Sequence, residues 1–254
     1  MLVTGGTGNL GRHVLPHLQE AGVNPRVLTR SPRSDSDGVV FFRGDTVKGD
    51  NLAEAVAGME TVLHLAGGAK GDDVAARNIA AAAKAAGVEH LVLISVVGAD
   101  HMPIGYFRAK ARAEEEFANS GVPYSIVRAA QFHDFILKTI GSMAKLPFVP
   151  LPSGLRFEPV DVSEVAAYVA EIALREPSGR ARDIAGPAVM DVEEIVRPLL
   201  KLRQRRFRPL RVPLSGAIGR AYKAGDNLAL PGVMRGGIPW SEYLVARAAV
   251  EQKV

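Results

Sequence analysis

The chain of 254 residues contains no cysteine, which excludes a disulfide framework, a thiolate zinc site and a cysteine nucleophile. It has no apolar run of about eighteen residues, the length that a membrane-spanning helix requires. No signal-peptide pattern leads the chain, so we expect a cytoplasmic protein. The first predicted strand begins at Met1 with almost no lead-in, which leaves open whether a few native residues precede it.

Acidic residues are slightly outnumbered by basic ones, giving a net charge of +4 and a pI near 9.4. Much of the excess lies between Lys201 and Arg211. Such a run marks either a nucleic-acid or membrane footprint, or a solvated helix end followed by an edge strand. We favour the solvated segment because no nucleic-acid-binding motif accompanies it, and we expect neither partner. Histidines and carboxylates lack metal-ligand spacing, so we expect no metal.

Short apolar segments typical of strands alternate with helical segments through the first 130 residues. Strands are expected at about residues 1–3, 25–30, 39–42, 61–66, 90–95 and 124–128, with helices after residue 11 and near 50–57, 72–86 and 105–119. Nearly continuous apolar strands that alternate with helices predict a parallel sheet covered on both faces. The expected fold is therefore a doubly wound α/β (Rossmann) sheet.

The alternation loosens after residue 130, where several prolines follow one another. A helix near 162–174 and a short strand near 182–185 are expected to rejoin the main sheet. Helices are also expected near 192–202 and around Trp240 and Tyr243. We predict a dinucleotide-binding core formed by residues 1–130 and about 158–186, and a smaller C-terminal substrate-side or lid lobe formed by 131–157 and 187–254, within one continuous globular unit.

A glycine loop connects the first strand to an amphipathic helix. Gly6, Gly8 and Gly11 fit the pattern G-x-G-x-x-G. Gly5, Gly8 and Gly11 fit the related pattern G-x-x-G-x-x-G. Glycines allow a tight turn and a close approach of backbone N–H groups to phosphates, and the helix N-terminus adds unpaired donors. The strand before and the helix after predict a pyrophosphate site. Its expected residues are Gly5, Thr7, Gly8, Asn9, Leu10, Gly11 and Arg12.

The end of the second strand bears on which dinucleotide binds. NAD-binding folds place a carboxylate there for the ribose hydroxyls, whereas a 2′-phosphate requires cations. The strand ends in Thr29 and Arg30. The first carboxylate after it, Asp35, lies beyond the position expected to contact the ribose. Arg30 and Arg12 offer charge-assisted, bidentate hydrogen bonds to phosphate. We therefore favour NADP(H) over NAD(H), the alternative being that Arg30 is an ordinary surface arginine.

Tyr106 and Lys110 form a Y-x-x-x-K pair on one face of the helix that follows the fifth strand. A nearby ammonium lowers the pKa of a tyrosine from about 10 and makes it a usable proton donor. Ser95 ends the fifth strand, where its hydroxyl can bind a substrate oxygen. The spacing alone is weak evidence, and a packed tyrosine is the alternative.

Several further segments complete a recognisable pattern: Arg43-Gly44-Asp45, His64-Leu65-Ala66-Gly67-Gly68, Ile94-Ser95-Val96-Val97-Gly98, and Ser120-Gly121-Val122-Pro123-Tyr124 with Arg128. With the glycine loop and the Tyr106–Lys110 pair, they make the chain resemble the short-chain dehydrogenase/reductase superfamily over nearly its whole length. The resemblance is to the atypical NAD(P)H-binding branch that includes NmrA-like proteins and small quinone reductases.

The resemblance implies roles for individual positions. Asp45 and Thr46 would border the adenine, and the segment of Ala66, Gly67 and Gly68 would pass beside a cofactor ribose. Ser95, Tyr106 and Lys110 would be the catalytic set: serine orients the substrate, tyrosine is the acid/base, and lysine lowers the tyrosine pKa and holds the ribose. The chain lacks the family's catalytic asparagine, and His64-Leu65-Ala66-Gly67 replaces its Asn-Asn-Ala-Gly sequence. Some members of this branch are redox sensors.

The residues after the sixth strand are expected to face the substrate. His133 is either a second proton donor or a packed, hydrogen-bonded histidine. The predicted substrate pocket is lined by Met102, Phe132, His133, Phe148 and Arg156. Phe157 is a further apolar candidate for this pocket. An apolar pocket suits a quinone, ketone or enone, and Arg156 suits an anionic group.

The leading hypothesis is an NADPH-dependent oxidoreductase that reduces a small carbonyl, enone or quinone, with Tyr106 as proton donor for carbonyls. One alternative is an NADP(H)-sensing regulatory protein without turnover, which the irregular catalytic set and the basic run would suit. A second is a nucleotide-sugar epimerase or dehydratase, ranked last because the C-terminal lobe is short. The expected partner is a small-molecule substrate, and either a monomer or a homodimer is compatible with the sequence.

Overall fold

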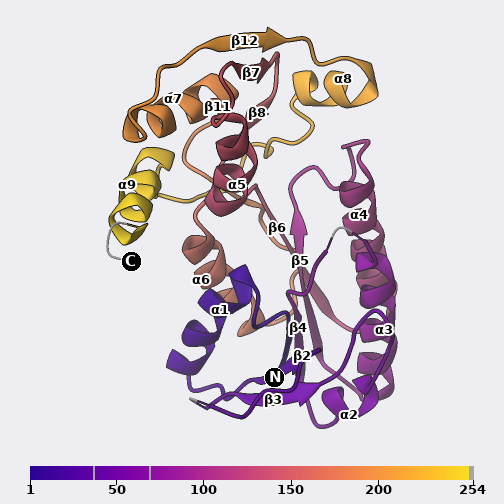
Figure 1. Ribbon diagram of the computed structural model, residues 1–254. Helices are drawn as coiled ribbons and strands as arrows, with labels where there is room; N and C mark the ends of the chain where they lie inside the picture. The colour runs from indigo at the N-terminus through magenta and orange to yellow at the C-terminus, as the bar shows by residue number, and fades with distance from the viewer. Residues whose placement is uncertain (37, 69, 252–254) are drawn as a thin grey trace. The chain divides into compact units, whose positions relative to one another are not determined.

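The computed structural model describes residues 1–36, 38–68 and 70–251 (Figure 1). Backbone contacts divide the chain into two compact units. The first comprises Met1–Ser95, Gly105–Arg128 and Ser163–Arg182, and the second comprises Val96–Ile104, Ala129–Val162 and Asp183–Val254. Within the described residues, no helix combines the length and the hydropathy needed to cross a bilayer.

A sheet runs through the first unit in the order β3 (Val40–Arg43), β2 (Arg26–Thr29), β1 (Leu2–Thr4), β4 (Thr61–His64), β5 (His90–Val96) and β6 (Tyr124–Ala129). The pairs β1–β2, β1–β4, β2–β3 and β4–β5 are parallel, and β9 (Gly179–Arg180) joins β6 in parallel. The order 3-2-1-4-5-6 is that of a doubly wound dinucleotide-binding sheet. The predicted α/β class is confirmed.

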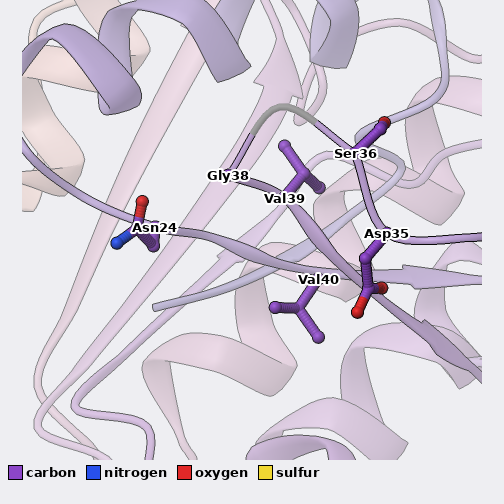
Figure 2. Close-up of a pocket in the computed structure, with 6 residues that line it drawn as sticks. All are labelled: Asn24, Asp35, Ser36, Gly38, Val39 and Val40. Atoms are coloured by element: carbon purple, nitrogen blue, oxygen red, sulfur yellow. The ribbon is translucent and has the colours of Figure 1, made fainter.

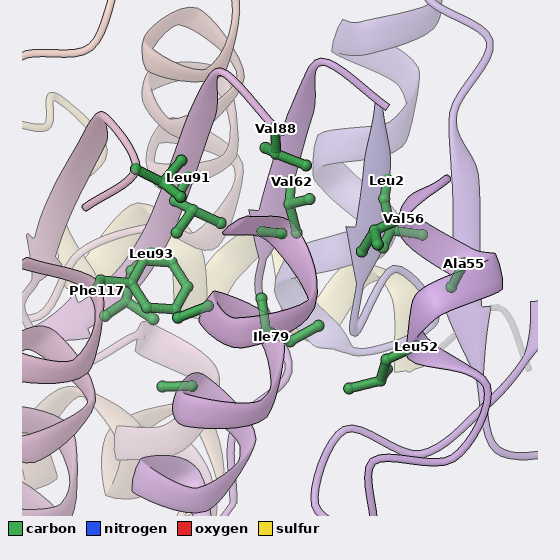
Figure 3. Packing of buried hydrophobic residues seen from close by; sticks show 14 of the residues in the cluster. Leu2, Leu52, Ala55, Val56, Val62, Ile79, Val88, Leu91, Leu93 and Phe117 are labelled. Carbon is green, nitrogen blue, oxygen red and sulfur yellow. The ribbon is translucent and has the colours of Figure 1, made fainter. Parts of the chain in front are cut away.

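Helices cover both faces of this sheet: α1 (Asn9–Glu20), α2 (Leu52–Val56), α3 (Asp72–Ala85), α4 (Gly105–Ala118) and α6 (Val162–Ala173). Figure 1 shows α1 and α6 on one face and α2, α3 and α4 on the other. The core beneath α3 and α4 joins Ile79 and Phe117 to Leu91 and Leu93 of β5 (Figure 3). The alanines of α3 let this helix lie close to its neighbours, which fixes the ends of β4 and β5 where the site residues lie.

The second unit contains short strands and four helices among its described residues: α5 (His133–Met143), β7 (Val149–Pro152), β8 (Arg156–Phe157), β10 (Ile184–Ala185), β11 (Met190–Asp191), α7 (Val192–Leu202), β12 (Pro209–Val212), α8 (Gly216–Ala224), β13 (Met234–Arg235) and α9 (Trp240–Glu251). Its core packs Ile136 of α5 and Ile195 of α7 with Trp240 of α9. Strand β10 lies between β13 and Ala129, the last residue of β6.

The predicted elements of the first 130 residues are all present, with bounds shifted by up to three residues. Helix α7 occupies the predicted residues 192–202. The stretch after residue 130 was expected to be irregular, but it contains α5, which buries Ile136 and Ile140 one turn apart. This i, i+4 spacing was a readable helix signal. Whether residues 131–157 and 187–254 form a substrate-side lobe stays a prediction.

Candidate active site

The loop between β1 and α1 has the shape that the glycine pattern predicts. Gly5 has a φ of +71°, and a Cβ there would lie 2.5 Å from the backbone nitrogen of Ala66. A Cβ on Gly11 would lie 2.3 Å from the carbonyl oxygen of Gly5. Only glycine fits either position, because both distances are far below van der Waals contact. The turn is closed by the Gly8 N–H, which donates to the Gly5 carbonyl at 2.9 Å.

The N-terminus of α1 has the features of an anion-binding site. Gly8 is its N-cap, no side chain caps the helix, and its first turn carries no acidic residue. Backbone donors and the positive end of the helix dipole therefore face outward from the glycine loop. Arg12 is exposed on the first turn, whereas Leu10 is buried and offers only its backbone. This arrangement fits a dinucleotide pyrophosphate.

A buried contact holds the ends of β1 and β4 together. The Thr4 hydroxyl lies 2.6 Å from Nδ1 of His64, and it accepts a hydrogen bond from the Ala66 N–H at 3.3 Å. The hydroxyl oxygen can accept from both groups or donate to His64, so the direction of the Thr4–His64 hydrogen bond depends on which ring nitrogen carries the proton. Burial first, and then the charge of Lys110, lowers the pKa of His64 to about 3. His64 therefore sets the position of the segment predicted to line the ribose.

Acidification should destabilise the fold through His64. The unfolded chain takes up this proton near pH 6.5, whereas the folded protein does so only at about pH 3. Between these values the unfolded state binds one more proton, so the free energy of unfolding falls by about 1.4 kcal/mol per pH unit as the pH drops. Urea unfolding between about pH 7 and about pH 4 measures this slope. The variant His64→Gln should have a shallower slope by that amount, and an equal slope in both proteins would contradict the assignment.

A hollow of about 620 Å³ lies at the carboxyl ends of β2 and β3. It is lined by Arg30, Arg43, Gly44, Asp45, Lys48, Gly49, Asp50 and Asn51. Oδ1 of Asp45 accepts hydrogen bonds from the Val47 and Lys48 N–H groups, and Asn78 of α3 donates to the carbonyl of Thr46 at 2.9 Å. Three cations and two carboxylates thus line the hollow, and the loop from Asp45 to Lys48 is held by its own turn and by α3.

A second hollow, shown in Figure 2, lies at the amino ends of β2 and β3. Its lining includes Asn24, which precedes β2, and Val40, which begins β3. Ligands of doubly wound sheets bind at the carboxyl ends of strands, so this hollow is not the dinucleotide site. Asp35 belongs to it and accepts a hydrogen bond from the Phe41 N–H at 2.8 Å. Asp35 is therefore absent from the lining of the hollow at Arg30.

Lys110 lies in the wall of the site rather than at its surface. Its Nζ is 2.9 Å from Oδ2 of Asp72 and donates to the Ile94 carbonyl at 3.3 Å. Oδ1 of Asp72 accepts from the Gly68 N–H at 2.8 Å, and a Cβ on Gly67 would lie 3.1 Å from Nζ. The buried Asp72–Lys110 pair therefore joins α3 and α4 to the Gly67–Gly68 segment and to the end of β5.

Tyr106 is 39% exposed and lies one helical turn before Lys110 on α4. Burial of the phenol, and next the carboxylate of Asp72, raises its pKa to about 12. The sequence-based expectation was the reverse, a pKa lowered by Lys110. The expectation was wrong, first because burial of the phenol disfavours the phenolate, and second because Asp72 repels the phenolate and pairs with the Lys110 ammonium.

Ser95 is buried at the end of β5, and its hydroxyl has no hydrogen-bond partner among the described residues. A buried hydroxyl without a protein partner is costly, so this hydroxyl is available to hydrogen-bond a bound group. Ser95 directly follows Ile94, whose carbonyl accepts from Lys110. The glycine cradle, the cationic hollow and this hydroxyl therefore fit a dinucleotide and a polar substrate group.

The five predicted substrate residues all fall in the second unit and differ in environment. Phe148 is 57% exposed, whereas Met102 and His133 are buried. The His133 ring packs against Tyr243 at 4.8 Å between centroids, and its Nδ1 lies 3.5 Å from Asp161. Phe132 is half-buried, and Arg156 donates to the Lys223 carbonyl at 3.4 Å. A shared pocket stays a prediction. The burial of His133 fits the alternative that it is a packed histidine.

Two residues of the site were not expected from the sequence. Asp72 begins α3 and pairs with a lysine 38 positions later, which no local pattern indicates. Arg43 ends β3 and lies in the hollow with Arg30. Its place at the end of a predicted strand, next to Arg30 on the neighbouring strand, was a signal that could have found it.

A family model described as NAD(P)H-binding matches residues 5–175. A (4-alkanoyl-5-oxo-2,5-dihydrofuran-3-yl)methyl phosphate reductase of Streptomyces griseus is 31% identical over 82% of this chain and 75% of its own length. An NAD(P)H azoreductase of Xenophilus azovorans is 26% identical over 91% and 82%. The solved structure of an Escherichia coli NADPH-dependent quinone oxidoreductase complexed with NADPH has a TM-score of 0.80 at 19% identity, covering 97% of this chain and 99% of that one.

Proposed function

Because this chain belongs to the NAD(P)H-binding family, in the atypical branch of the short-chain dehydrogenases/reductases, and is an NAD(P)H-dependent oxidoreductase, we propose that it reduces a small carbonyl, enone or quinone. Tyr106 is the proton donor when a carbonyl is reduced. The observation that carries this proposal is the buried hydroxyl of Ser95, which finds no partner in the described part of the chain and lies beside the Lys110 contact at the end of β5. The reductases among the relatives support it.

The bound dinucleotide supplies the hydride. The Gly5–Gly11 loop and the N-terminus of α1 bind the pyrophosphate, and Gly67 and Gly68 line the ribose. Ser95 Oγ donates a hydrogen bond to the substrate oxygen and orients it. Tyr106 holds its phenolic proton at neutral pH because its pKa is about 12, so it acts as an acid. The phenolate that is left after the proton moves to the substrate oxygen takes up a proton from solvent, and Lys110, one turn away, would hold the ribose.

NADP(H) is the preferred dinucleotide in this proposal. Arg30, Arg43 and Lys48 line the hollow at the carboxyl ends of β2 and β3, and Asp35 lines a different one. A 2′-phosphate carries two negative charges that these cations match, whereas NAD(H) offers only hydroxyls.

Replacing Arg30 by alanine should weaken NADPH binding about 10- to 100-fold, the worth of a charge-assisted hydrogen bond, and leave NADH binding nearly unchanged. Fluorescence titration with each nucleotide measures the two dissociation constants. Arg33→Ala is the matched control, since the Arg33 guanidinium lies over the Phe41 ring at 5.8 Å, outside the hollow's lining. Equal weakening of NADPH and NADH in Arg30→Ala would contradict the phosphate contact.

The direct test of the function is NADPH consumption, followed by nicotinamide absorbance, with a panel of quinones, aldehydes, ketones and enones. NADH runs in parallel. Turnover with at least one class establishes the reductase and names its substrate class. NADPH binding without turnover across the whole panel would contradict the proposal and favour a sensor that binds the nucleotide.

A further inference from the structure

The basic residues of this chain are concentrated in two stretches of the second unit. Residues 135–157 contain three lysines and arginines, residues 195–225 contain nine, and neither stretch contains an aspartate or glutamate. The rest of the chain therefore carries 19 of the 31 basic side chains together with all 27 acidic ones. A net charge of +4 thus conceals a strongly basic region in an otherwise acidic molecule.

The two stretches lie side by side. Strand β12 pairs in parallel with β7, with Leu210 opposite Pro150 (Figure 1). The Arg205 guanidinium donates to the carbonyl of Ala144 at 2.6 Å, which attaches the segment after α7 to the end of α5. Residues 145–148 and 201–212 therefore belong to one surface, which we call the basic face.

The basic face is exposed and its charge is not neutralised locally. Every residue from 201 to 212 is exposed except Phe207, whose ring lies under the Arg197 guanidinium at 4.6 Å. Within the described part of the chain, no carboxylate forms an ion pair with Arg206, Arg208 or Arg211. Leu202 and Leu210 are exposed among these cations. A protein surface of this kind attracts a polyanion and also offers aliphatic side chains to an apolar phase.

We propose that the basic face docks on an anionic lipid surface, which departs from the sequence-based expectation of no membrane partner. The cations match lipid headgroups, and the aliphatic side chains between them gain free energy by entering the boundary between headgroups and acyl chains. Nucleic acid is the less suitable partner, because the exposed side chains between the cations, Leu202, Leu210 and Phe148, are apolar and cannot hydrogen-bond the edges of bases.

Sedimentation with lipid vesicles tests the proposal. The protein should bind vesicles of phosphatidylcholine that contain phosphatidylglycerol and should not bind phosphatidylcholine alone. Binding should fall steeply between about 0.05 M and about 0.5 M salt. The triple variant Arg206→Ser, Arg208→Ser, Arg211→Ser should lower the partition coefficient about a hundredfold. Leu202→Ser with Leu210→Ser should lower it about tenfold at either salt concentration.

A second triple variant, Arg77→Ser, Lys84→Ser, Arg175→Ser, removes the same number of exposed charges from the first unit and should bind vesicles as the parent does. NADPH affinity should be unchanged in all three variants, which shows that they fold. Equal binding to neutral and anionic vesicles, an equal loss in both triple variants, or binding of RNA or duplex DNA in place of vesicles would overturn the proposal.

Discussion

Replacing Tyr106 by phenylalanine should lower kcat/KM for a carbonyl substrate by about 10²- to 10⁴-fold, the contribution of a positioned general acid. The phenol is the proton source in the proposed reaction, and phenylalanine removes only its oxygen. NADPH affinity should stay nearly unchanged, because the groups assigned to the nucleotide are the glycine loop, the Arg30 hollow and Lys110. Steady-state rates and a nucleotide titration on the same preparation separate the two effects.

Tyr124→Phe is the matched control for this experiment. Tyr124 begins β6 and packs against the core of the first unit, at the amino end of its strand. The same loss of one oxygen there should leave turnover unchanged. Carbonyl turnover that survives Tyr106→Phe at the parental rate would contradict the assigned role and leave Tyr106 as a packing residue beside Lys110.

The raised pKa of Tyr106 also determines how the rates of reduction and oxidation should depend on pH. Below its pKa of about 12 the phenol keeps its proton, so ionisation of Tyr106 should not lower the reduction rate between about pH 6 and about pH 9. The reverse oxidation needs the phenolate and should accelerate as the pH rises. A reduction rate that does not fall with pH, together with an oxidation rate that rises, distinguishes an acid held in its protonated form from a tyrosine already activated by Lys110.

The fold of the first unit was predictable because its signals are local. Strand β5 is a continuous buried run, and Gly5 and Gly11 occur where the backbone leaves no room for a Cβ. Each is recognisable from a few consecutive residues. The second unit was less predictable, because its strands are short and its core forms only when α5, α7 and α9 pack together.

The site was predictable in its parts and not in its electrostatics. Tyr106, Lys110 and Ser95 could be singled out by their spacing and by the strand ends. The partner of Lys110 could not, because Asp72 reaches it only after α3 and α4 have packed. Burial of the phenol, and next that carboxylate, raise the pKa of Tyr106 against the expected direction. Sequence patterns locate chemical groups, whereas pKa values depend on charges that the fold brings together.

Replacing Asp72 by asparagine should lower the free energy of unfolding by about 3–5 kcal/mol, because it leaves the Lys110 ammonium buried without its counter-charge. Asparagine has nearly the same shape and keeps an oxygen for the Gly68 N–H, so the loss reports charge rather than packing. Urea unfolding of the parent and the variant near neutral pH measures the difference.

Asp73→Asn is the matched control, one position further along α3. Asp73 pairs with Arg112 at 2.7 Å at the surface, where the Arg112 side chain is 52% exposed, so the same substitution should cost less than about 1 kcal/mol. Adding Lys110→Met to Asp72→Asn should restore part of the lost stability, since it removes the unpaired charge. Equal losses in the two asparagine variants, or a further loss on adding Lys110→Met, would show that Asp72 stabilises the fold by some means other than its charge. The predicted outcome would instead establish that this carboxylate holds Lys110 in the wall of the site and that the buried ammonium requires its negative charge.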